Sequence, residues 1–271
     1  MRNNKREGCV RKASVLVAAV VILLSLGAWA DDWSKDYNVG AKPELRLDAK
    51  DGNVDVTAWD LNQIHAHIVT DGYRIGGDGV RIDESQSGNS VMINIRIPHN
   101  FCIGWCRKSL RVELQVPKQA NLNLKTGDGN ITGSGVGGDV YLNTGDGNIT
   151  LNSLEGNLEA TTGDGNVRID GRFDRLQIHT GDGNVEAEAR GGSKLNDSWS
   201  VRTGDGNVTL RVPQDLSADL DLRTGDGRIT LDFPVTVSGS MSRSRISGKL
   251  GQGGPLLEVH TGDGSIHLDK L

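Results

Sequence analysis

One short turn sequence recurs along this chain at nearly constant spacing. Thr-Gly-Asp-Gly, followed by a polar residue and a branched aliphatic residue, occurs seven times. The copies begin at Thr126, Thr144, Thr162, Thr180, Thr203, Thr224 and Thr261, and the first four are 18 residues apart. A degenerate eighth copy begins at Lys50. A short fixed period of this kind indicates a stacked repeat architecture and argues against the core of a globular enzyme.

Each repeat period contains two short stretches in which apolar and polar residues alternate. Val140 and Leu142 share one parity before a turn, and Ile149 and Leu151 share one parity after it, with Thr150 between them. Alternation with a period of two is the pattern of half-buried β-strands. The sequence therefore predicts an all-β protein with two strands and two turns in each period.

Two arrangements of these strands agree with the pattern. Asp-Gly between alternating runs favours hairpins, which would give an antiparallel meander. A single-stranded parallel β-solenoid of about 18 residues per coil explains more, because stacked coils place each repeated residue over its counterpart, ~4.8 Å away. We therefore predict the solenoid. In it, threonines and asparagines form hydrogen-bonded ladders, and glycines adopt positive φ where the chain turns between sheets.

The first 30 residues have the features of a secretory signal peptide. Five basic residues precede an apolar run from Ala13 to Leu26, and Ala28-Trp29-Ala30 fits a cleavage site. We predict an exported protein of the periplasm, the cell surface or the medium. No membrane span is expected after cleavage, because the apolar run belongs to the signal.

The exported part divides into two predicted regions. Residues 31–118 alternate over longer stretches and predict an N-terminal cap of antiparallel strands, continuous with the solenoid and closing its edge. Residues 119–271 contain the regular repeats. Within them, the Ser- and Gly-rich segment from Pro234 to Pro255 replaces one ordinary coil and is expected to form a looser coil or a surface loop.

The charge balance excludes two classes of partner. After removal of residues 1–30, 25 Lys and Arg stand against 34 Asp and Glu, a net charge of −9. Nucleic acids and anionic membrane surfaces attract proteins of the opposite balance. A surface protein or a glycan is the expected partner.

The chain also resembles a known family. The segment from Leu47 to Val56, the pair Trp59-Asp60, the segment from Val112 to Pro117 and the serial Gly-Asp-Gly turns resemble the bacterial putative-adhesin family of β-strand-repeat proteins, a domain of unknown function. The resemblance covers roughly Leu45 to Leu271. It implies an exported, non-enzymatic repeat domain and supplies no catalytic residues.

The turn aspartates are the main candidates for metal binding. A solenoid would align them in one row: Asp51, Asp128, Asp146, Asp164, Asp182, Asp205, Asp226 and Asp263. Calcium binds such oxygen-rich turns in β-roll modules, and the candidate ligands are Asp128, Asp146, Asp164, Asp182 and Asp205. The alternative is that each side chain caps its own turn and faces solvent. We expect no cofactor and keep calcium as the alternative.

Catalysis is not predicted. A polysaccharide-cleaving β-helix enzyme would need paired carboxylates, and an aspartate row offers such pairs at every coil, so it identifies no site. His65 and His67 share one face of a strand without a third ligand and are expected to be exposed imidazoles.

The segment between Pro98 and Leu110 contains both cysteines that remain after processing. Cys102 and Cys106 are predicted to form a disulfide in an oxidising compartment, with free thiols as the alternative. Phe101 and Trp105 either form a contact site or pack onto the first coil. The sequence as a whole predicts an exported, non-catalytic β-solenoid with an adhesin-like binding or cell-envelope scaffolding role.

Overall fold

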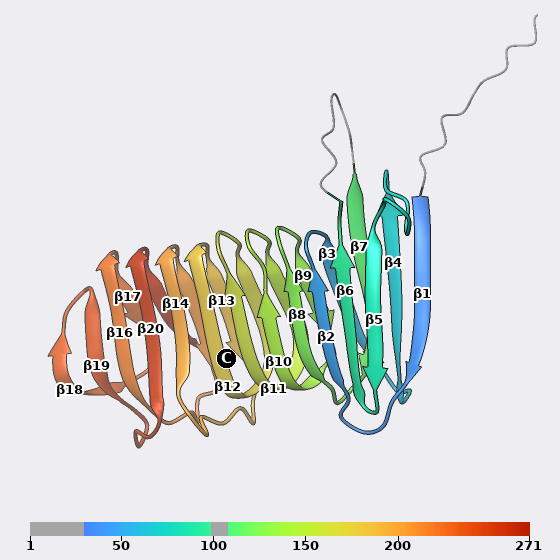
Figure 1. Cartoon of the computed structure of the whole chain (residues 1–271). Helices are drawn as coiled ribbons and strands as arrows, with labels where there is room; N and C mark the ends of the chain where they lie inside the picture. The colour runs from blue at the N-terminus through green and yellow to red at the C-terminus, as the bar shows by residue number, and fades with distance from the viewer. Residues whose placement is uncertain (1–29, 99–107) are drawn as a thin grey trace, which may run out of the picture.

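The computed structural model describes residues 30–98 and 108–271, which form 21 β-strands in one sheet. No helix occurs in these two ranges. The strands follow one another along a single axis and lie in two facing layers (Figure 1). We name these layers the front wall and the back wall, as seen in Figure 1. The prediction of an all-β, mostly parallel protein is confirmed, and the antiparallel meander is wrong for the repeats.

The front wall consists of twelve strand segments joined edge to edge. In spatial order they are β5 (Arg81–Ser87), β6 (Ser90–Arg96), β2 (Glu44–Ala49), β8 (Asn121–Thr126), β10 (Gly137–Asn143), the second halves of β11 (Ile149–Thr162) and β12 (Val167–Asp182), β14 (Trp199–Asp205), β20 (Leu256–Asp263), β16 (Ala218–Asp226), β19 (Arg245–Leu250) and β18 (Val235–Met241).

The back wall follows the same axis. Its spatial order is β1 (Ala30–Asn38), β4 (Gln63–Asp71), β7 (Ser109–Pro117), β3 (Asn53–Trp59), β9 (Ile131–Ser134), the first halves of β11 and β12, β13 (Val185–Ala189), β15 (Val208–Val212), β21 (Ile266–Lys270) and β17 (Ile229–Leu231).

The repeats pair in parallel and in register. Leu122, Val140, Leu158 and Leu176 are successive partners across the front wall. Ile131, Ile149, Val167 and Val185 are successive partners across the back wall. Parallel pairing in register aligns the side chains of equal parity, so the inward rows of both walls meet in a thin aliphatic core.

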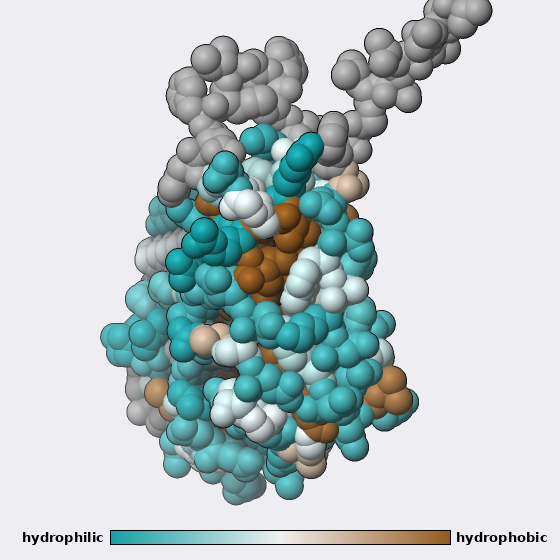
Figure 2. Space-filling model, turned by 45° about the vertical axis from the view of Figure 1, so that its right-hand side comes forward, coloured by the Kyte–Doolittle hydropathy of each residue, from teal (hydrophilic) through white to brown (hydrophobic). Residues whose placement is uncertain are grey.

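The N-terminal end differs from the repeats in strand direction. Antiparallel pairs join β1 to β4, β4 to β7 and β5 to β6. The degenerate repeat, which is flanked by β2 and β3, lies inside the stack rather than at this end. β2 pairs in parallel with both β6 and β8, and β3 pairs in parallel with both β7 and β9. Figure 2 brings this end forward and shows a mostly hydrophilic surface with a hydrophobic area in its upper part and smaller ones below it. Trp33, Tyr73 and Ile82 are among the half-buried hydrophobic residues of these strands and their turns.

The C-terminal end departs from the sequence order of the repeats. β20 lies between β14 and β16, and β21 lies between β15 and β17, so the last copy of the repeat stands between the two copies that precede it. The segment expected to be a loose coil or a loop instead forms β18 and β19, an antiparallel hairpin that pairs with β16 and ends the front wall. The expectation of a loop was wrong because Val235, Ile246 and Leu250 supply a buried or half-buried face.

One aromatic pair widens the core near its middle. Phe173 and Trp199 are both fully buried, with ring centroids 6.2 Å apart at 87°. Such an edge-to-face arrangement is the favourable one for aromatic rings. In the part of the chain that the structure describes, the search for a helix long and apolar enough to cross a membrane finds none.

Candidate functional site

The repeat threonines form a hydrogen-bonded ladder that joins the corners of neighbouring coils. All seven are buried, and Thr144 Oγ1 donates to the carbonyl oxygen of Gly129 at 2.7 Å. Every copy repeats this bond across 2.7–3.0 Å; the other pairs are Thr126–Gly52, Thr162–Gly147, Thr180–Gly165, Thr203–Gly183, Thr261–Gly206 and Thr224–Gly264. The predicted threonine ladder is confirmed, and it satisfies carbonyl groups that would otherwise be buried without a donor.

The asparagines form a second ladder on the outside of the corner. The main-chain N–H of Asn148 donates to Oδ1 of Asn130 at 2.8 Å, and its Nδ2 lies 3.2 Å from the same oxygen. The same bonds continue through Asn166, Asn184 and Asn207, and the main-chain N–H of Ser265 closes the series. This predicted ladder is also confirmed, and its course from Asn207 to Ser265 follows the spatial order of the coils.

The second glycine of the corner agrees with the predicted positive φ in four copies and differs from it in the other four. Gly52, Gly206, Gly227 and Gly264 adopt positive φ. Gly129, Gly147, Gly165 and Gly183 do not adopt positive φ. A Cβ atom on Gly147 would instead lie 2.1 Å from the carbonyl oxygen of Gly129 in the neighbouring corner. The glycine is therefore required by the close approach of stacked backbones rather than by the sharpness of the turn.

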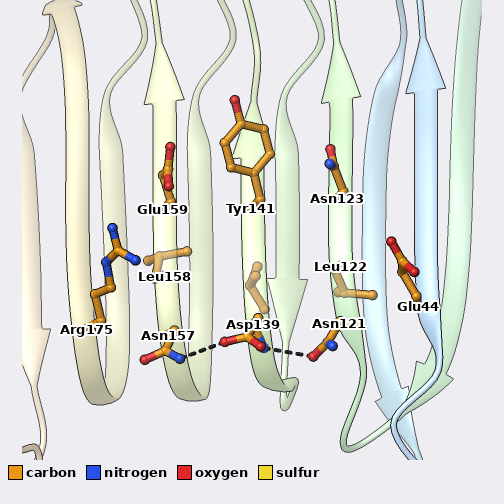
Figure 3. A pocket seen from close by; sticks show the side chains of 11 residues that line it. Glu44, Asn121, Leu122, Asn123, Asp139, Tyr141, Asn157, Leu158, Glu159 and Arg175 are labelled. Carbon is orange, nitrogen blue, oxygen red and sulfur yellow. Dashed lines mark hydrogen bonds between the residues drawn. The ribbon is translucent and has the colours of Figure 1, made fainter. Parts of the chain in front are cut away.

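The rigid front wall carries a groove of about 310 Å³ on its outer face. Its lining comes from β2, β8, β10, β11 and β12, so the groove runs across the strands rather than along one of them (Figure 3). Glu44, Asp139, Glu159 and Arg175 supply charge, and Asn121, Asn123 and Asn157 supply amides. The groove thus presents donors and acceptors at successive strand positions.

A chain of hydrogen bonds fixes one edge of the groove. Asn157 Nδ2 donates to Asp139 Oδ1 at 2.6 Å, and the main-chain N–H of Asp139 donates to Asn121 Oδ1 at 3.2 Å (Figure 3). Each of these polar groups has further hydrogen-bonding capacity after these bonds are made. The edge is therefore preorganised, which lowers the entropic cost of binding a ligand.

Tyr141 and Asn123 stand side by side at the other edge. Tyr141 is half-buried, and Lys125 Nζ lies 5.6 Å from the centroid of its ring. Asn123 Oδ1 is buried and has no hydrogen-bond partner among the described residues. An acceptor in this condition costs about 1–3 kcal/mol. A ligand donor that reached this amide would recover part of that cost.

The sequence did not single out the groove, although it contains a signal for it. Asn121, Asp139, Asn157 and Arg175 are 18 residues apart and have the parity of outward residues, as do Asn123, Tyr141 and Glu159. A row of polar residues at one phase of the repeat indicates a surface row, but it does not show that the row borders a depression.

The turn aspartates lie in one exposed row, with an order that differs from the prediction. All eight are exposed. Asp263 pairs with both Asp205 and Asp226, because the last repeat lies between its two predecessors. Asp51 lies next to Asp128, whose main-chain N–H is 3.4 Å from Asp51 Oδ1. Within residues 30–98 and 108–271, no three His, Cys, Asp or Glu side chains are grouped closely enough to hold a metal ion.

The two histidines of the cap each meet carboxylates. His65 Nδ1 is 2.6 Å from Asp36 Oδ1. His67 Nδ1 is 3.1 Å from Glu113 Oε2, and its Nε2 is 3.7 Å from Asp32 Oδ2. Both imidazoles are partly exposed, so these pairs tie the outer faces of β1, β4 and β7 together.

Several predicted features lie outside the described residues. These are most of the signal peptide, the disulfide between Cys102 and Cys106, and the contact site of Phe101 and Trp105. They remain predictions.

Comparison with protein families gives one match that spans most of the chain. The family described as Toastrack DUF4097 matches residues 35–269. The predicted family resemblance is thereby confirmed. Comparison with curated proteins gives no match.

Comparison with solved structures also gives matches, among them the following three. A putative cell adhesion protein from Clostridium sporogenes is 15% identical with a TM-score of 0.45, over 89% of this chain and 100% of that one. A putative lipid binding protein from Parabacteroides distasonis is 13% identical with a TM-score of 0.41, over 89% and 98%. A putative adhesin from Bacteroides fragilis is 11% identical with a TM-score of 0.34, over 89% and 97%.

Proposed function

Because the chain belongs to the Toastrack DUF4097 family, whose name assigns no reaction, we propose its function from its own surface: it is an exported, non-catalytic binding module with an adhesin-like role at the cell envelope. The observation that carries the proposal is the preorganised groove across the front wall. A ligand lying there contacts five strands whose spacing is fixed by the threonine and asparagine ladders.

The finer architecture is part of this proposal. The molecule is a single-stranded β-solenoid of about 18 residues per coil, with an antiparallel cap at its N-terminal end. The registers of the repeat strands support the coil length, and the antiparallel pairs of β1, β4 and β7 support the cap. A solenoid of this kind offers a long, flat wall, and repeat proteins use such extended surfaces for binding.

The chemistry of the groove favours a glycan as ligand. The amides of Asn121 and Asn157 donate and accept hydrogen bonds, and the carboxylate of Asp139 accepts them, as the hydroxyl groups of a sugar require. The ring of Tyr141 offers an apolar face beside them. A surface protein that places an extended segment in the same groove is the other possible occupant.

The test is binding of the mature chain to a glycan array and, separately, to an extract of envelope proteins. Tyr141→Ala should weaken ligand binding roughly ten-fold or more, as loss of a half-buried aromatic contact does. Tyr73→Ala is the matched control, because Tyr73 is also half-buried beside a lysine, 4.8 Å from Lys108 Nζ, but lies outside the groove.

Three results would oppose the proposal. The first is that the mature chain binds neither a glycan nor an envelope protein. The second is that Tyr141→Ala and Tyr73→Ala weaken binding equally. The third is that bound glycans are shortened, with new reducing ends, which would show catalysis rather than binding.

A further inference from the structure

A second depression adjoins the groove on the front wall. Its volume is about 330 Å³, close to the 310 Å³ of the groove. Glu159 lines both, so the two depressions are contiguous. The lining of the second one continues from β11 and β12 to β14 and β20. Together the two depressions cross the wall from β2 to β20, and we call this combined depression the long groove.

One row of polar side chains runs through the whole length of the long groove. Each member is the register partner of the next on six successive strands: Asn123, Tyr141, Glu159, Gln177, Ser200 and Glu258. We call this the central row, and Figure 3 shows its first three members side by side. The row reaches Glu258 because β20 of the last repeat lies beside β14. Since neighbouring strands are ~4.8 Å apart, the row spans roughly 24 Å.

The long groove crosses the strands at a slant. In the first depression it extends from the central row to Asp139 and Asn157, which come two residues earlier on the same strands. In the second depression it extends to His179 and Arg202, which come two residues later. Residues on one face of a strand are ~6.8 Å apart and neighbouring strands ~4.8 Å apart, so each step along the slanted path from one strand to the next measures about 5 Å.

The length of this step discriminates between a glycan and a protein segment as occupant. An extended peptide advances by ~3.4 Å per residue and repeats its side chains on one face every ~6.8 Å, so its groups would fall out of step with the strands. An extended chain of β-1,4-linked pyranoses advances by nearly one strand step with each sugar unit. Each unit therefore meets the same position on the next strand. Chains with α-1,4 linkage curl into helices and would leave a straight row after a few units.

The lining gives no excess of positive charge that would select an acidic polymer. Four carboxylates and two arginines line the long groove in the described part of the chain, and Arg202 pairs with Glu258 at 2.7 Å. Arg46 on β2 and Lys125 on β8 lie directly beside this lining. Groups of both signs are thus interleaved with amides and hydroxyls, which suits a ligand bound through neutral hydroxyl groups.

We propose that the long groove binds an uncharged, linear β-1,4-linked glycan, with one sugar unit over each strand of the central row and about six units in contact. This inference rests on the proposed function and extends its site into the second depression. Pyranoses whose hydroxyl groups are equatorial expose apolar C–H faces, and the ring of Tyr141 offers a surface for one of them. The amide of Gln177 and the hydroxyl of Ser200 then bond to the hydroxyl groups of later units.

The experiment measures, by titration calorimetry, the affinity of the mature chain for oligosaccharides from the disaccharide to the octasaccharide. Cello-oligosaccharides are β-1,4-linked glucose, and malto-oligosaccharides contain the same glucose units in α-1,4 linkage. Affinity for the cello series should rise roughly 2–10-fold with each added unit, as one further hydrogen bond provides, and level off at about six units. The malto series should show no such rise. Fully deacetylated chitohexaose, which is cationic, should bind no more tightly than neutral N-acetylchitohexaose.

A double variant tests whether the second depression belongs to the same site. Gln177→Ala with Ser200→Ala should weaken binding of cellohexaose roughly ten-fold or more and leave cellotriose unchanged, because the trisaccharide fits over Tyr141 within the first depression. Gln115→Ala with Ser109→Ala is the matched control. It removes the same two side chains from exposed positions on β7 of the back wall and should change neither affinity.

Thermal melting first shows that both double variants are folded. A rise in affinity to about six units that stops near three in the Gln177 and Ser200 variant supports the proposal. Equal binding of the malto series, levelling off at three units in the unmodified chain, or equal losses in the two double variants overturns it but leaves glycan binding itself intact. Tighter binding of the deacetylated hexamer also overturns it, because the ligand would then be cationic. If an envelope protein binds and no oligosaccharide does, the proposal fails in favour of the protein occupant, and if nothing binds, the proposed function fails with it.

Discussion

Replacing Thr162 by valine keeps the β-branched shape of the side chain and removes its hydroxyl from the middle of the threonine ladder. Thr162 is 1% exposed. Its Oγ1 donates to the carbonyl oxygen of Gly147 at 2.8 Å and accepts from the main-chain N–H of Gly165 at 3.3 Å. The substitution therefore leaves two backbone groups of the corner without their present partner.

The expected cost follows from those two bonds. A buried polar group without a partner costs about 1–3 kcal/mol, and the longer bond to Gly165 contributes toward the low end. The new methyl group returns up to ~0.8 kcal/mol through apolar burial. The net loss in the free energy of unfolding is then roughly 1.5–3 kcal/mol, which lowers the melting temperature by about 3–12 °C for a domain of this size.

The measurement is urea denaturation followed by circular dichroism. Thr162→Val should lower the midpoint with an unchanged m-value. Thr161→Val is the matched control, because Thr161 is the adjacent residue with its side chain on the outer face and no hydrogen bond from its hydroxyl to another described residue. If the two variants are equally stable, the ladder does not stabilise the stack. The same conclusion follows if the free energy of unfolding of Thr162→Val lies within about 0.5 kcal/mol of that of the unmodified chain.

Three further predictions follow from the same contacts. Gly147→Ala should destabilise the fold by about 1–3 kcal/mol or more, because the new Cβ would lie 2.1 Å from the Gly129 carbonyl oxygen. In the same urea assay Gly191→Ala should be nearly neutral, because nothing lies within 4 Å of a Cβ at that position. Burial and, to a lesser extent, the Glu84 carboxylate raise the pKa of Tyr37, so this tyrosine ionises at lower pH in the unfolded chain, and stability should fall as the pH rises above the ordinary tyrosine pKa of ~10. Melting curves at alkaline pH should show a smaller fall for Tyr37→Phe. Addition of EDTA and then calcium should shift the melting temperature little, because the turn aspartates are exposed and their repulsion is screened; a large shift on adding calcium would establish the metal row.

The local structure of the repeats could be predicted because each residue of the corner performs the same task in every coil. Thr144 and Asn148 recur at one phase, and stacking is the arrangement in which such recurrence has a physical use. The role of Gly147 was inferred wrongly, because the sequence shows that a side chain is excluded but not whether φ or a neighbouring backbone excludes it.

The order of the coils could not be predicted from the repeats themselves. The corner that begins at Thr261 offers the same donors and acceptors as those that begin at Thr203 and Thr224, so any of them can stack on any other. The hairpin of β18 and β19 pairs with β16 and ends the front wall, and its apolar face was not recognised among serines and glycines. The groove was missed for a similar reason, since it is a property of neighbouring coils rather than of one repeat.

The two ends of the stack share a design that the sequence order conceals. At each end the terminal strands of the front wall are antiparallel: β5 and β6 at one end, β18 and β19 at the other. Near each end one coil also lies out of sequence order: β2 and β3 beside β6 and β7, and β20 and β21 one coil inward of β16 and β17. Parallel repeats leave an open edge that would pair with other chains, and an antiparallel hairpin covers it. Repeat stacks lose their outermost units most easily. Here β20 and β21 have a paired strand on both sides, so this last repeat is held like an interior coil.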